Sequence, residues 1–171
     1  MLDANKLGAL GTLISDRIED ALEGLSPSAA ALLSMLHFKP GLTATELAAI
    51  AAVAQPTVTR LVDGLVRQGL VAREAAPGRS TPLRVTEEGD RRAVRLQERR
   101  LSALAGLLGV LAPEERAAFA GLVDRVLVGA TTSRAFARTT CRLCEHDLCG
   151  PEVCPVGCRA GEIERAAGTE R

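Results

Sequence analysis

Apolar residues recur along most of this chain at the three- and four-residue spacing of amphipathic helices. The first such segment covers residues 3–25. Ser26 and Pro27 then have the pattern of an N-cap followed by a proline in the first helical turn, and they predict the start of a second helix. The Lys-Pro-Gly sequence at residues 39–41 ends this helix, because proline and glycine together break helical periodicity.

Two further helices are predicted close together in the next segment. Thr43 and Glu46 stand three residues apart, the spacing of a capping box, and open a short helix over residues 44–51. Gln55 and the following proline begin another helix, which runs to about residue 68 and ends at a glycine. Its predicted buried stripe is Val58, Leu61, Val62 and Leu65.

The pattern then changes from helix to strand and back to helix. Residues 70–74 and 83–85 predict two short strands, and the Pro-Gly-containing segment between them predicts a hairpin tip. Thr86, followed by two glutamates, predicts the N-cap of a long helix that continues to about residue 111. A final amphipathic helix starts near residue 113.

These elements predict a mainly α-helical α+β fold, a winged helix-turn-helix flanked by long helices, with a small Cys-rich module at the C-terminus. From residue 139 the composition shifts to Cys, Gly and Pro, and the helical periodicity fades. The predicted units are an N-terminal dimerisation helix (1–26), the winged helix-turn-helix (27–86), dimerisation helices (87–138), the Cys-rich module (139–160) and a flexible tail (161–171).

Charge is distributed unevenly although the chain of 171 residues has no net charge. Residues 60–100 hold ten arginines and six acidic residues, a local excess of +4, so the remaining residues carry −4. Such a local excess in the predicted helix and wing suits a surface that lies against phosphate. Aromatic residues make up only 2% of the chain, which argues against a single-strand binder built on base stacking.

The outer face of the predicted helix at 55–68 is polar and suited to base edges and phosphates. A polar helix face is often merely solvated, so the interpretation depends on the ordered set of elements around it. The predicted DNA-binding residues are Thr45, Gln55, Thr57, Thr59, Arg60, Arg67, Arg79 and Arg84.

Four segments together resemble the MarR family of bacterial transcription regulators, over about residues 5–130. They are Leu-Thr-Ala-Thr-Glu-Leu-Ala at 42–48, Gln-Pro-Thr-Val-Thr-Arg-Leu-Val-Asp-Gly-Leu at 55–65, Gly-Leu-Val at 69–71 and Leu-Arg-Val-Thr-Glu-Glu-Gly at 83–89.

The resemblance implies a homodimer that binds a pseudo-palindromic operator in double-stranded DNA and usually represses transcription. It implies that the recognition helix enters the major groove and that a wing-tip arginine enters the minor groove; Gln55, Thr57, Arg60 and Arg79 match these positions. It also implies a possible small-molecule effector. The family wing commonly has an aspartate two residues before this arginine, where the present chain has Pro77.

Size alone also favours a dimer. The winged segment is only about 60 residues long, which is marginal for an independent core. The amphipathic helices on either side of it need a surface to cover their apolar stripes, and a symmetric dimer provides one. Two recognition helices also read two half-sites, which one helix cannot do.

All five cysteines lie in one short segment. The predicted metal ligands are Cys141, Cys144, Cys149 and Cys154, because a Cys-x2-Cys pair with two further cysteines nearby can surround one metal ion. Cys158 is an alternative ligand or a resolving thiol. The spacing of the first four resembles that of a zinc knuckle, but the glycine and the stacking aromatics of that motif are missing.

Three interpretations of the cysteines remain open. Zn²⁺ held by four thiolates, for structure or sensing, is favoured; an iron–sulfur cluster held by the same residue type is next. Thiols without metal that pair on oxidation are the third, and would make the chain a redox-switch regulator. Because the module follows the last dimerisation helix, metal binding is expected to change the angle between the two DNA-binding lobes.

Other classes of function are less favoured. The chain has neither a phosphate-binding glycine loop nor a Ser/His/Asp set, and its single Cys-x2-Cys lacks the βαβ setting of a thiol oxidoreductase, so no enzyme is predicted. A winged helix that binds protein instead of DNA is the other alternative. Without a secretory signal or a long apolar run, a cytoplasmic protein without membrane contact is expected.

Overall fold

The computed structural model describes residues 1–75, 81–150 and 152–169. Within these ranges the chain is mainly helical and contains one two-stranded antiparallel sheet, as the sequence predicted. The elements in chain order are α1 (Leu2–Ala21), α2 (Pro27–Phe38), α3 (Ala44–Ala51), α4 (Gln55–Arg67), β1 (Val71–Arg73), β2 (Leu83–Val85), α5 (Glu87–Leu108), α6 (Pro113–Ala130), α7 (Arg134–Thr140) and α8 (Pro155–Thr169).

The predicted capping residues begin α2 and α3. The Ser26 hydroxyl accepts a hydrogen bond from the Ala29 N–H at 3.3 Å. Thr43 and Glu46 form the full capping box: the Thr43 hydroxyl accepts from the Glu46 N–H at 3.3 Å, and the Glu46 carboxylate accepts from the Thr43 N–H at 2.8 Å. These bonds satisfy N–H groups that have no partner inside the helix.

The core lies where α2, α3 and α4 meet the sheet and the first half of α5. It is built from aliphatic side chains only, so its stability comes from the burial of branched apolar groups without aromatic packing. Its largest fully buried members are Leu22, Leu32, Leu33, Leu36, Leu47, Val58, Val62, Leu65 and Leu83.

The sheet is short and is held on both sides by backbone hydrogen bonds. β1 and β2 pair antiparallel, with Val71 opposite Val85. On the other edge of β2, the Gly41 N–H donates to the Leu83 carbonyl at 2.8 Å and the Leu83 N–H donates to the Leu42 carbonyl at 3.0 Å. The hairpin is therefore fixed to the α2–α3 connection, and its base is part of the core.

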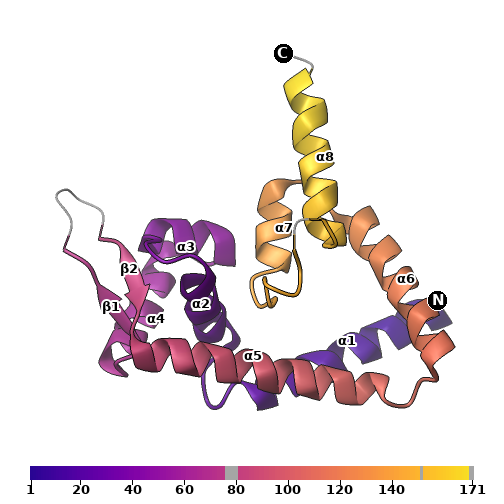
Figure 1. The fold of residues 1–171 in the computed structure, drawn as a ribbon, viewed down its shortest axis with the longest axis horizontal. Coiled ribbons are helices and arrows are strands. Elements are labelled where there is room, and N and C mark those ends of the chain that lie inside the picture. The colour runs from indigo at the N-terminus through magenta and orange to yellow at the C-terminus, as the bar shows by residue number, and fades with distance from the viewer. Residues whose placement is uncertain (76–80, 151, 170–171) are drawn as a thin grey trace.

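The long helix α5 spans the molecule from the hairpin to the region of α1 and α6 (Figure 1). α1 packs along α5, as the element contacts and the ribbon both show. Most of the surface of these outer helices faces solvent: α1 buries only Ala21, and α6 buries none of its residues. In the described part of the chain, no helix is both long and apolar enough to cross a membrane.

The C-terminal segment differs from its prediction. Residues 161–169, expected to form a flexible tail, belong to α8, which packs against α6 and α7. Ala160 and Val156 are buried between these helices, and the Arg134 guanidinium bonds the Glu164 carboxylate at 2.7 Å. The prediction failed because the helix depends on these tertiary contacts, and its short apolar stripe is hard to distinguish from a loop in sequence.

Candidate nucleic-acid interface and cysteine cluster

α4 has one apolar face and one polar face. Val58, Val62 and Leu65 are buried in the core. The polar residues predicted from the sequence lie on the other side of the helix and are exposed: Gln55, Thr57, Thr59, Arg60 and Arg67. In the described ranges, neither Arg60 nor Arg67 forms an ion pair, so the charge of both guanidinium groups is available to a phosphate or a base edge.

A hydrogen bond joins the two helices of the helix-turn-helix at this surface. The Gln55 side-chain amide donates to the Thr45 hydroxyl at 3.0 Å, and the Thr59 hydroxyl donates to the Gln55 carbonyl at 3.1 Å. These side chains line a hollow of about 340 Å³ between α3, α4 and the hairpin. Polar groups from separate elements therefore meet on one surface.

The arginines of the hairpin are partly neutralised by acidic neighbours. Arg84 on β2 forms an ion pair with Glu74 across the hairpin. Arg73, at the end of β1, bonds the Asp63 carboxylate of α4 at 2.6 Å and also lines the hollow. Arg79 and Pro77, on which the wing-tip prediction depends, lie outside the described residues. The sequence analysis did not single out Arg73, although it contributes to the local charge excess.

The position of α3 beside this surface is supported by an ionised capping residue. Hydrogen bonds from the backbone N–H and the hydroxyl of Thr43 lower the pKa of Glu46, because they stabilise its charged form. The pair thereby fixes the start of the helix that contributes Thr45.

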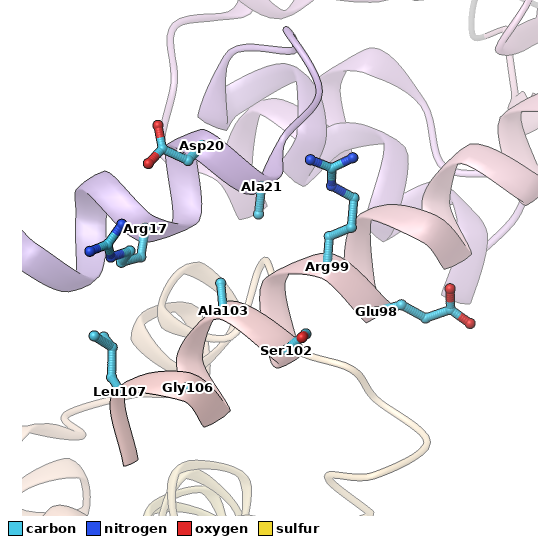
Figure 2. A pocket seen from close by; sticks show the side chains of 9 residues that line it. All are labelled: Arg17, Asp20, Ala21, Glu98, Arg99, Ser102, Ala103, Gly106 and Leu107. Atoms are coloured by element: carbon cyan, nitrogen blue, oxygen red, sulfur yellow. The ribbon is translucent and has the colours of Figure 1, made fainter. Parts of the chain in front are cut away.

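A second hollow, of about 710 Å³, lies between α1 and α5 (Figure 2). Arg17 and Asp20 come from α1, and the remaining lining residues come mainly from α5. Small residues form part of its wall, so the two helices approach each other without filling the space. The residues that line the hollow are Arg17, Asp20, Ala21, Glu98, Arg99, Ser102, Ala103, Gly106 and Leu107.

The structure groups the predicted metal-ligand cysteines at the junction of α7 and α8. Cys141 follows α7 directly, and Cys154 directly precedes α8. The side chain of Cys141 forms hydrogen bonds with those of Cys144 and Cys154. Cys149 is exposed and interacts electrostatically with Cys144 and Cys154.

This cluster contacts the winged helix directly. The Gln97 amide of α5 donates to the Leu143 carbonyl at 3.2 Å and also bonds the Ser34 hydroxyl of α2 at 3.3 Å. The His146 ring stacks on Phe38 at the end of α2, with ring centroids 4.9 Å apart. The cysteine segment is therefore packed on the body of the winged helix, in addition to following the last long helix.

The buried Arg100 of α5 lies close to the cluster. Its charge interacts with Cys144, Glu145 and Cys149, while burial lowers the pKa of the guanidinium. A hydrogen bond from Cys141 and the charge of Arg100 lower the pKa of Cys144 to about 6, and the same Cys141–Cys144 bond raises the pKa of Cys141.

As the side chains stand, no group of three or more His, Cys, Asp or Glu residues in the described ranges is arranged to hold a metal ion. The four predicted ligands are brought near one another, but they do not surround a common point. The metal site therefore stays a prediction. Cys158 and His146 line the same hollow as Cys141, Cys149 and Cys154.

A short helix, a turn, a polar-faced second helix and a β-hairpin define the class of winged-helix proteins. Residues 23–80 match the family model described as MarR family. This match and the solved structures described next support the assignment of the chain as a MarR-family winged-helix transcription regulator. The cysteines lie beyond the matched residues.

Several solved MarR-family structures are similar to this chain. A MarR family protein from Bacillus stearothermophilus is 27% identical, covering 75% of this chain and 93% of its own, with a TM-score of 0.67. YusO from Bacillus subtilis is 26% identical, covering 72% and 90%, with a TM-score of 0.65. The Mycobacterium tuberculosis MarR family protein Rv2887, in complex with DNA, is 26% identical, covering 72% and 95%, with a TM-score of 0.62. Comparison with curated protein sequences gives no significant match.

Proposed function

We propose that the chain is a sequence-specific regulator that binds double-stranded DNA as a homodimer and represses transcription at a pseudo-palindromic operator. The observation that carries the proposal is the exposed polar face of α4, with Arg60 and Arg67 unpaired in the described ranges. The similarity to Rv2887, described in complex with DNA, supports the same function here.

The homodimer is supported by the outer helices. α6 has no buried residue, yet Leu122 and Val126 on one of its faces are 56% and 62% exposed. An apolar face of this kind is costly in water and is covered by association. A second copy would also supply a second recognition helix for the other half of a palindromic site.

A small-molecule effector belongs to the proposal. Rv2887 is also described in complex with salicylic acid and with p-aminosalicylic acid. In the present chain the hollow between α1 and α5 is lined by Arg17 and Arg99 (Figure 2). A guanidinium group pairs well with a carboxylate, so a small aromatic acid is the class of effector that fits this lining.

The first test is selection of binding sites from fragmented genomic DNA, followed by fluorescence anisotropy on the selected duplex at several salt concentrations. We expect Arg60→Ala to weaken binding by about 1–3 kcal/mol and to reduce the slope of log affinity against log salt by about one. Arg159→Ala removes an exposed arginine from α8 and serves as the matched control, expected to bind like the parent.

Two outcomes would contradict the proposal. If no duplex is enriched, the winged helix does not read DNA, and a protein-binding module becomes the better interpretation. If Arg60→Ala and Arg159→Ala bind equally well, the polar face of α4 is not the contact surface.

A further inference from the structure

The cysteine cluster is unusual because thiols from separate parts of the C-terminal segment meet while the chain offers them few ordinary partners. Cys141 bonds both Cys144 and Cys154, and Cys149 lies within electrostatic reach of the latter two. Thiols are weak hydrogen-bond partners, so this grouping gains little stability from S–H contacts alone.

The groups around the cluster favour negatively charged sulfur. The Gly157 N–H, in the first turn of α8, donates to the Cys154 sulfur at 3.2 Å. The guanidinium of Arg100 is buried beside Cys144 and Cys149. A buried cation needs anionic neighbours, and thiolates in this cluster supply them.

We propose that Cys141, Cys144, Cys149 and Cys154 bind one zinc ion through four thiolates. With Zn–S bonds of about 2.3 Å, the sulfur atoms of a tetrahedral site lie roughly 3.8 Å apart. Hydrogen-bonded thiols have a comparable separation, which fits the contacts of Cys141 with Cys144 and Cys154. A four-iron cluster holds its thiolates further apart, because iron and sulfide ions lie between them.

Zinc binding completes an arrangement that the chain has only partly formed. Cys149 is the exposed member, on the turn between Cys144 and Cys154, so this turn closes over the ion. The four thiolates and Zn²⁺ have a net charge of −2, and Arg100 offsets part of it. Ligands that assemble fully only with the metal are usual for structural zinc sites.

Cys158 is outside the proposed set. It lies on α8 one turn after Cys154 and lines the same hollow, so it is the natural control for a thiol that is near the site without being a ligand.

The experiment uses the full chain, purified anaerobically with reductant, and measures metal by plasma mass spectrometry. We expect one zinc per chain. After chelation, Co²⁺ should bind with the thiolate charge-transfer and tetrahedral d–d bands of a sulfur-coordinated ion, and Zn²⁺ should displace it one for one.

The variants Cys144→Ser and Cys149→Ser should each weaken Zn²⁺ binding at least tenfold, measured by competition with a chromophoric chelator, while Cys158→Ser should bind like the parent. Because Cys149 is exposed, Cys149→Ser keeps the test valid if Cys144→Ser fails to fold. Circular dichroism checks the fold of each variant.

Three results would overturn the proposal: a chain that binds neither Zn²⁺ nor Co²⁺ when reduced, a brown protein with iron and acid-labile sulfide, or a loss in Cys158→Ser as large as that in Cys149→Ser. None of these results depends on DNA binding, so the metal site and the proposed regulator are tested separately.

Discussion

Single side chains at the helix starts connect the sequence most directly to the fold. Thr43 and Glu46 form a capping box that begins α3, and Ser26 begins α2. Each bond satisfies a donor that would otherwise have no partner, whatever the rest of the molecule does. Such residues are local determinants, so the sequence predicted both helix starts correctly.

The cap of α3 gives a prediction at this scale. Thr43→Ala should lower the free energy of unfolding by about 1 kcal/mol at pH 7, because the Glu46 N–H loses its acceptor. Thr12→Ala is the control: the Thr12 hydroxyl bonds the Gly8 carbonyl inside α1, where alanine is a better helix former. Urea denaturation measures both, and a loss in Thr12→Ala equal to that in Thr43→Ala would contradict the assignment.

The same cap has a pH dependence. Thr43 lowers the pKa of Glu46 in the folded chain, so the stability it adds is fully present above the unfolded pKa near 4.5. This contribution is lost as the pH falls through the lower folded pKa. The difference in unfolding free energy between the parent and Glu46→Gln should therefore be smaller at pH 3 than at pH 7, and an equal difference at both would refute it.

At the scale of elements, the packing of α5 against the strand that precedes it depends on one glycine. A Cβ on Gly89 would lie 1.8 Å from the Leu70 carbonyl oxygen, which no side chain tolerates. The close approach lets the Thr86 N–H bond the Leu70 carbonyl at 3.0 Å and sets the direction in which α5 leaves the sheet. The direction of α5 in turn sets the position of the winged helix relative to α1 and α6.

We therefore expect Gly89→Ala to destabilise the chain by about 3 kcal/mol or more, because the backbone at Leu70 has to move. Gly64→Ala, in the helix α4, is the matched control. Its Cβ would meet only the end of the Arg67 side chain at 3.9 Å, so we expect a neutral or slightly stabilising effect. Thermal unfolding followed by circular dichroism separates the two, and similar midpoints would show that the junction is not tightly packed.

At the scale of the whole molecule, the unburied outer helices and the docked cysteine segment define its organisation. α1 and α6 add little to the core of one chain. The cysteine segment, in contrast, packs on α2 and α5 through Gln97 and Phe38. A change in this segment therefore acts directly on the winged helix, rather than only through the angle of the dimerisation helices as the sequence suggested.

The proposed dimer leads to a prediction at this scale. Leu122→Glu with Val126→Glu should convert the dimer to a monomer, because two charges would enter the apolar face that a second copy covers. Asp124→Asn, on the opposite face of α6, should leave the dimer intact. Sedimentation velocity gives the mass of each; a monomeric parent, or a dimeric double variant, would contradict the role of α6.

The local pattern of this sequence determined the winged helix. Periodicity, caps and the Pro-Gly breaks predicted α2 to α5 and both strands, because these signals act over a few residues and agree with one another. The polar face of α4 follows in the same way, since a helix that buries Val58, Val62 and Leu65 turns Thr57 and Arg60 outward. These side chains were named from sequence, and their contacts with DNA stay a prediction.

Only the tertiary structure decided which distant groups meet. It brought Arg73 to Asp63, Arg100 to the cysteines and His146 to Phe38, and it formed α8 where the sequence predicted a tail. Spacing places the cysteines near one another but says nothing about the helix on which they pack, because that contact joins residues far apart along the chain. Local patterns determine elements, whereas long-range packing determines the neighbours of each side chain.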